Sequence, residues 1–289
     1  MNNKYLPEGE LCRTAENREY IGSLTGLEKA MREGKILEGV VNLCDSDTYT
    51  LHIDLCGIDG VIRREDAIYG AEAKDIAIIT RVGKPVAFKV MDIVNENGKC
   101  TVVLSRKEAQ RECVENYIST LATGDIIPAR ITHFEPFGAF MDIGCGVVSL
   151  MTIDCISVSR ISNPQERFSL RERVNVIVKS IDSENNRIYV STRELFGTWE
   201  ENASMYKAGQ TVSGIVRSIE SYGIFVELAP NLAGLAELKD GVKVGKDMYN
   251  RRFDFENGAV LGAVGAVNTG NGLYAMQQLI FEQKDKRPV

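Results

Sequence analysis

Histidine, tryptophan and paired cysteines are scarce in this chain. Of its 289 residues two are histidine and one is tryptophan, and the seven cysteines include no Cys-x-x-Cys pair. Zinc sites need clustered cysteine or histidine ligands, so no metal is expected and the cysteines are predicted to be reduced packing residues. P-loop, Gly-x-Ser-x-Gly and His-Glu-x-x-His patterns are also missing, so we predict no enzyme activity and no cofactor.

Long apolar runs and an excess of positive charge are missing too. The longest apolar runs are too short to span a bilayer, and Met1–Tyr5 lacks the apolar core of a secretory signal. We therefore expect a cytoplasmic protein without a membrane partner. The net charge of −6 argues mildly against strong binding to duplex phosphates, although eight basic and eight acidic residues balance in Gly124–Arg193. Single strands are different, because base stacking supplies much of their affinity.

The segment Gly124–Leu195 carries the clearest pattern in the chain. Five short strand-like runs are separated by turn signals, and the connection after the third run is the longest. This arrangement predicts a five-stranded Greek-key barrel of the oligonucleotide/oligosaccharide-binding (OB) type. The predicted strands are Ile126–Thr132, Phe137–Ile143, Val147–Ile153, Val174–Ile181 and Arg187–Thr192.

Three motifs in this segment resemble a known repeat. They are Phe137-Gly138-Ala139-Phe140, Asp142-Ile143-Gly144, and the pair Lys179–Asp182 with Arg187–Ser191. Together they resemble the RNA-binding repeat of the bacterial small-subunit ribosomal protein S-one family, in its short Firmicutes-like form. The resemblance implies that the chain binds single-stranded RNA, mRNA in particular, and assists translation at the small ribosomal subunit.

Two partial copies flank this repeat at a spacing of 90 and 85 residues, and they indicate internal duplication. We predict an all-β chain of tandem five-stranded OB-fold barrels joined by short α-helical linkers. Capping boxes at Ser105 and Ser191 predict the linkers, the first over 106–121, and another at Thr25 predicts a short helix to Glu33 that ends at Gly34. The predicted parts are a lead-in at 1–34, a degenerate repeat at 35–107, the best-matched repeat at 124–195 and an atypical repeat at 209–289.

The resemblance also implies the RNA contacts. Phe137 and Phe140 would stack on bases, and a bulge at Gly138 would bring them to one face of the strand. Asp142 would accept a hydrogen bond from a base, while Lys179 and Arg187 would meet the backbone. The full set of candidates is Phe137, Phe140, Asp142, Thr152, Lys179 and Arg187 in the central repeat, Tyr222 and Phe225 in the third, and Tyr49, His52 and Arg63 in the first.

Several alternatives stay open at this point. The chain could be a regulator of translation or RNA decay that never docks on the ribosome, the RNA-binding appendage of an enzyme, or a module that binds proteins. The match to the repeat also stops after Gly245, where a Gly/Ala-rich run replaces the two expected strands. We therefore predict an incomplete third barrel, through true divergence or a change of reading frame near codon 246.

Overall fold

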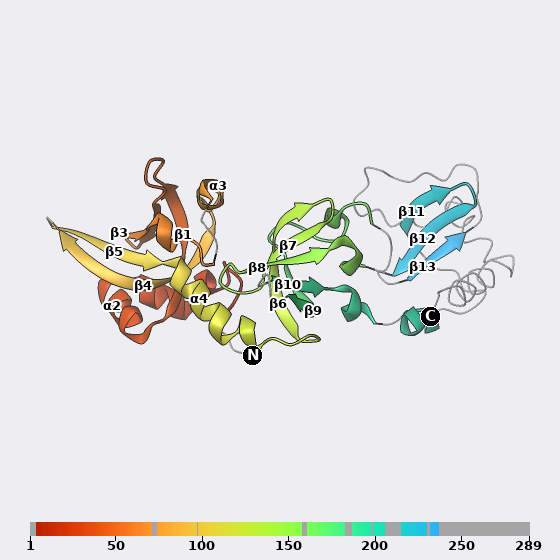
Figure 1. Ribbon diagram of the computed structural model, residues 1–289, viewed down its shortest axis with the longest axis horizontal. Coiled ribbons are helices and arrows are strands. Elements are labelled where there is room, and N and C mark those ends of the chain that lie inside the picture. The colour runs from red at the N-terminus through yellow and green to blue at the C-terminus, as the bar shows by residue number, and fades with distance from the viewer. Residues whose placement is uncertain are drawn as a thin grey trace. The chain divides into compact units, whose positions relative to one another are not determined.

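The computed structural model describes residues 4–70, 74–96, 98–157, 161–182, 187–197, 199–205, 215–229 and 232–236. These residues are mostly strands with few helices (Figure 1). They form two closed five-stranded barrels and a three-stranded sheet. The chain falls into two compact units, of which one holds 1–133, 140–150 and 169–189 and the other holds 134–139, 151–168 and 190–289. The predicted fold class, tandem OB-type barrels with short helical linkers, is confirmed.

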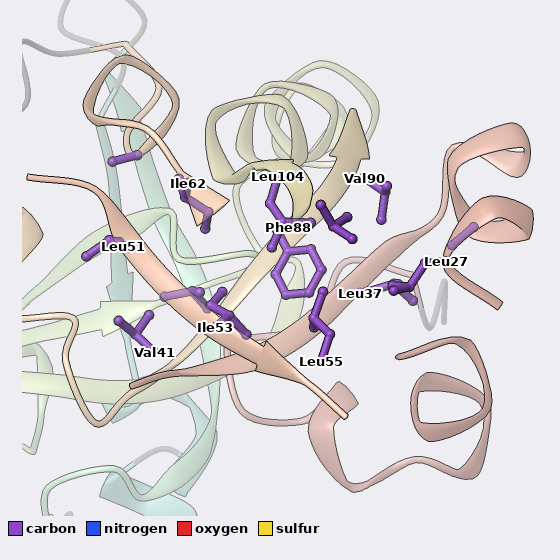
Figure 2. Close-up of a cluster of buried hydrophobic side chains, with 14 of the residues drawn as sticks. Leu27, Leu37, Val41, Leu51, Ile53, Leu55, Ile62, Phe88, Val90 and Leu104 are labelled. Carbon is purple, nitrogen blue, oxygen red and sulfur yellow. The ribbon is translucent and has the colours of Figure 1, made fainter. Parts of the chain in front are cut away.

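The first barrel has the strand order β1-β2-β3-β5-β4, with β3 and β5 parallel and the other described pairs antiparallel. Its core follows from strand alternation, since Leu51, Ile53 and Leu55 of β2 are all buried. Phe88 lies in the middle of this cluster (Figure 2). The strands are β1 (Ile36–Cys44), β2 (Leu51–Leu55), β3 (Ile58–Ile62), β4 (Pro85–Glu96) and β5 (Lys99–Ser105), and the short helices η2 (Arg64–Asp66) and α3 (Asp75–Ile79) lie between β3 and β4.

The segment before the first barrel packs onto it. It contains η1 (Leu11–Arg13), α1 (Ala15–Ile21) and α2 (Leu24–Glu33). Leu27 and Ala30 of α2 are fully buried in the barrel's core cluster. The predicted end at Gly34 is confirmed by its left-handed φ of 61°, but the predicted cap is wrong, because Ser23 and not Thr25 accepts the first free backbone N–H.

Helix α4 (Arg106–Asn116) links the first barrel to the central one. Ser105 caps it as predicted, by accepting a hydrogen bond from the Glu108 backbone N–H at 3.1 Å. The predicted apolar face is buried at Ala109 and Cys113. The helix ends earlier than the predicted Leu121, and the short turn η3 (Ile118–Thr120) follows it.

The central barrel closes in the same order, β10-β8-β7-β6-β9. All five predicted strands are present, with ends that differ by at most three residues. They are β6 (Ile126–Glu135), β7 (Gly138–Asp142), β8 (Val148–Thr152), β9 (Arg173–Asp182) and β10 (Arg187–Ser191), and η4 (Ile153–Cys155) and η5 (Pro164–Glu166) lie in the long connection. The second linker contains η6 (Arg193–Phe196) and α5 (Trp199–Ser204), which are separated at Gly197, whose φ is 78°.

The third repeat is described only in its first half. Strands β11 (Ile215–Glu220), β12 (Gly223–Ala229) and β13 (Leu232–Ala236) form an antiparallel sheet with Ile224 and Val226 buried. The predicted incomplete closure concerns residues after Gly245, which lie outside the described residues, so it stays a prediction.

Candidate nucleic-acid interface

An aromatic pair lies on the outer side of the central barrel. Along β7, Ala139 and Met141 are fully buried, and alternation directs Phe140 between them to the other face. The Phe140 ring centroid lies 5.9 Å from that of His133 on β6, with a tilt of 33°. Thr132 donates its hydroxyl to the Phe140 carbonyl at 3.1 Å. Two neighbouring strands therefore present two adjacent flat rings, a surface suited to unstacked bases.

His133 was not among the predicted contacts. It is one of two histidines in the chain and stands near the end of a predicted strand, beside the strand that carries Phe140. The pairing of β6 with β7 could have indicated that His133 lies beside Phe140. It did not, because the sequences of two strands do not by themselves fix which residues lie opposite each other.

Phe137 and Gly138 lie where the chain enters β7. The Phe137 side chain is 53% exposed, and its carbonyl accepts a hydrogen bond from the Ile153 N–H at 2.9 Å. A Cβ atom at position 138 would lie 2.4 Å from the Met151 carbonyl oxygen. The backbone of residue 138 thus lies so close to that of Met151 that only glycine fits, whether or not a bulge is present. The bulge expected there, and the stacking roles of both phenylalanines, stay predictions.

The polar candidates of the central repeat are spread over three strands. Arg187 is exposed as the first residue of β10, and Lys179 is exposed on β9. Thr152 ends β8, is half-buried, and places its hydroxyl 3.1 Å from the Cys155 sulfur. The two cations therefore lie on the surface, whereas Thr152 has an internal partner.

Asp142 is a correction to the predicted contacts. Its side chain is 2% exposed, and three backbone N–H groups donate to it, from Gly144 at 2.8 Å, Gly146 at 3.0 Å and Glu8 at 2.7 Å. Burial and the nearby Glu8 carboxylate raise its pKa to about 7. A carboxyl group that is buried and already bonded cannot accept a hydrogen bond from a base, so Asp142 orders the turn between β7 and β8.

The candidates of the first repeat have partners within the barrel. Tyr49 lies in a turn before β2 with φ 55°, and the Arg64 guanidinium lies 5.3 Å from its ring centroid. The His52 Nδ1 atom lies 3.0 Å from the Asp59 carboxylate. Arg63 is exposed at the start of η2. The pairing of Tyr49 with Arg64 was not predicted.

The third repeat brings its two predicted aromatics together. Tyr222, in the turn before β12, is 67% exposed, and Phe225 on β12 is half-buried. Their ring centroids are 6.2 Å apart in an edge-to-face arrangement of 89°.

All seven cysteines are free thiols. Within the described ranges, no group of His, Cys, Asp and Glu side chains is arranged to hold a metal ion. None of the helices in those ranges is long and apolar enough to cross a membrane.

Comparison with known proteins agrees with the central barrel. Residues 120–193 match the S1 RNA binding domain. The small ribosomal subunit protein bS1 of Staphylococcus aureus is 31% identical over 163 residues, which make up 55% of this chain and 41% of that protein. The bS1 homolog of Bacillus cereus is 33% identical over 161 residues, or 54% of this chain and 41% of that protein. The chain thus spans less than half the length of these relatives.

Likeness to solved structures is weak. The solution structure of GSP13 from Bacillus subtilis has a TM-score of 0.26 and 17% identity, covering 46% of this chain and 95% of that chain. It adds nothing to the sequence match. The resemblance seen in the motifs is confirmed by that match: residues 120–193 match the S1 RNA binding domain, and about half of the chain is similar to the bacterial small-subunit proteins bS1.

Proposed function

We propose that this chain binds single-stranded RNA through the outer face of its central barrel and assists the translation of mRNA at the small ribosomal subunit. The observation that carries the proposal is the Phe140–His133 ring pair, presented by β7 and β6 within the matched domain. Exposed Phe137 extends the aromatic surface at the start of β7. Bases of single-stranded RNA have free π faces, whereas those of a duplex are stacked on each other.

The basic residues would add the backbone contacts. Lys179 and Arg187 are exposed on β9 and β10 of the same barrel, and Thr152 ends β8. Tyr222 and Phe225 would form a second, smaller stacking surface in the third repeat. In the first repeat Tyr49, His52 and Arg63 would contribute less, because Tyr49 and His52 are engaged by Arg64 and Asp59.

An anisotropy titration tests the binding. Unstructured RNA and a duplex of equal length are titrated in parallel at several salt concentrations, and we expect a clear preference for the single strand. Equal affinity for both would contradict the stacking mechanism. The His133→Ala variant should weaken binding to the single strand, while Arg18→Ala, an exposed change on α1, should not.

Ribosome co-sedimentation tests the place of action. The relatives are named as small ribosomal subunit proteins, which favours a ribosomal role over a free regulator of translation or decay, or the appendage of an enzyme. We expect the chain to sediment with the small subunit, and more so when mRNA is present. A chain that binds RNA in solution but stays in the supernatant would support the free regulator.

A further inference from the structure

The N-terminal segment Tyr5–Arg13 is bonded to both the first and the central barrel. The Glu8 carboxylate accepts from the Ala87 N–H of β4 at 3.1 Å, while the Glu8 N–H donates to Asp142 of β7. The Cys145 N–H donates to the Leu6 carbonyl at 2.9 Å. We call this segment the strap, because it joins residues of the two barrels within one compact unit.

Gly9 is the residue of the strap that has side chains of both barrels beside it. Its φ is 96°, and a Cβ atom there would lie 2.9 Å from the Arg130 Nη1 atom of β6 and 3.0 Å from the Pro85 Cγ atom of β4. Only glycine fits between these side chains in this conformation. Pro85 and Arg130, from different barrels, therefore flank one residue of the strap.

Two cations lie next to this point without an acidic partner. Lys84 precedes Pro85, and its carbonyl accepts the Val41 N–H at 3.0 Å. Arg171 donates its N–H to the carbonyl of Ile131, the neighbour of Arg130, at 3.0 Å, and has a left-handed φ of 68°. Among the described residues, neither Lys84 nor Arg171 has a carboxylate within ion-pair distance.

The nearby acids are already engaged by other cations. Glu8 pairs with Arg106 and lies 3.6 Å from Arg81, and Glu10 pairs with Arg130 and with Arg173 at 3.3 Å. Partial burial and the charges of Arg81 and Arg171 lower the pKa of Lys84, and the charge of Glu8, which is paired with Arg106, offsets only part of this effect. The net charge of the chain is −6, yet these two cations form no ion pair with a carboxylate. Two positive charges that repel each other are unfavourable, and a bound anion would reduce the repulsion.

The position of this pair relates it to the aromatic surface. Arg171 is bonded to Ile131 of β6, and His133 lies two residues further along the same strand, a separation of roughly 7 Å. The Arg171 backbone is therefore bonded to the same strand that carries His133, the partner of Phe140 in the ring pair. A single RNA strand could occupy both the cation pair and the ring pair.

We propose that Lys84 and Arg171 form a phosphate-binding site at the junction of the first and central barrels, which holds the backbone of a single-stranded RNA leaving the stacking surface. This proposal rests on the proposed RNA binding. It gives the first repeat a role that does not depend on its aromatics.

The test compares two double variants of the full chain. Lys84→Gln with Arg171→Gln removes the proposed contacts, and Lys29→Gln with Arg32→Gln removes the same two charges from the exposed face of α2. Affinity for unstructured RNA is measured from low to high salt. Each lost phosphate contact flattens the slope of log K against log salt by about 0.7. The slope of the first double variant should therefore be shallower by up to about 1.4, and its affinity at 0.1 M salt should be lower by up to about 25-fold.

The control double variant should keep nearly the wild-type slope. If both double variants behave alike, or if affinity falls with no change of slope, the junction site is wrong while RNA binding stands. If the wild type binds no single-stranded RNA, both proposals fail. The single variant Arg171→Gly suits the left-handed backbone and guards against misfolding, and it should show about half of the slope change.

Discussion

Replacing Glu8 with glutamine measures how strongly the strap stabilises the unit that contains it. Glu8 is 7% exposed and Arg106 is 1% exposed. The Arg106 Nε and Nη2 atoms donate to the two Glu8 carboxylate oxygens at 2.7 and 3.2 Å. Arg106 also donates to the Ala67 carbonyl at 3.1 Å. After the substitution the Arg106 guanidinium would keep its neutral carbonyl partner, but it would lose the one carboxylate that is paired with it.

The magnitude follows from leaving a buried charge unpaired. Such a change costs about 3–5 kcal/mol, and for Glu8→Gln we expect the lower end because the amide oxygen still accepts one bond. For a unit of this size about 1 kcal/mol shifts the melting temperature by about 2–4 °C, which gives a fall of about 6–12 °C. Differential scanning calorimetry measures it, and limited proteolysis should show earlier cleavage near the strap.

A matched double variant separates charge from packing. Glu8→Gln with Arg106→Met removes both charges and keeps a long apolar chain, so it should cost less than Glu8→Gln alone. If Glu8→Gln lowered the free energy of unfolding by less than about 1 kcal/mol, the reasoning would be refuted. Such a small loss is typical of breaking an exposed ion pair, whereas breaking a buried one costs several-fold more. A double variant less stable than the single one would refute it too.

Three further predictions concern the stacking surface, pH and thiols. Phe140→Ala should weaken binding to unstructured RNA by about 1–3 kcal/mol with unchanged folding, and unchanged affinity would remove that face from the interface. Burial raises the pKa of Glu38 to about 7 from its usual 4.5, so the folded state binds this proton more tightly than the unfolded chain. The loss of the Glu38 proton should therefore lower the unfolding free energy by about 1.4 kcal/mol per pH unit as pH rises through this range, and Glu38→Gln should make the measured slope shallower by that amount in denaturant titrations. The share of Asp142, whose pKa is also raised to about 7, should remain in the variant. Strong chelator and reductant should leave the melting temperature unchanged, because the seven cysteines are free thiols, and a clear fall with either would contradict the packing role.

The barrels were predictable because each strand has a local signal. Apolar alternation and turn residues predicted all five central strands, and glycine at 34 marked a helix end correctly. The cap of α2 was predicted wrongly, since Ser23 and Thr25 are both residue types that cap helices and the helix begins after Ser23.

The site was less predictable, because burial is a tertiary property. Asp142 looked like an exposed acceptor, yet the Glu8 N–H that closes over it comes from a residue 134 positions away. Gly9, the fifth residue of the strap, has a local reason to be glycine in its φ of 96°, but the sequence could not show which side chains surround it. Its neighbours Pro85 and Arg130 meet only after both barrels have formed.

The strap changes what a degenerate first repeat can contribute. Two binding surfaces joined by a flexible linker gain affinity only in proportion to their effective concentration, and they gain most when their geometry is fixed to suit one ligand. Here the buried bonds of Glu8 join residues of the two barrels within one unit. The first repeat can therefore assist a strand that stacks on the central repeat even though Tyr49 and His52 are engaged internally. Its contribution would come from charge, at Lys84, and would appear as salt dependence and not as base preference.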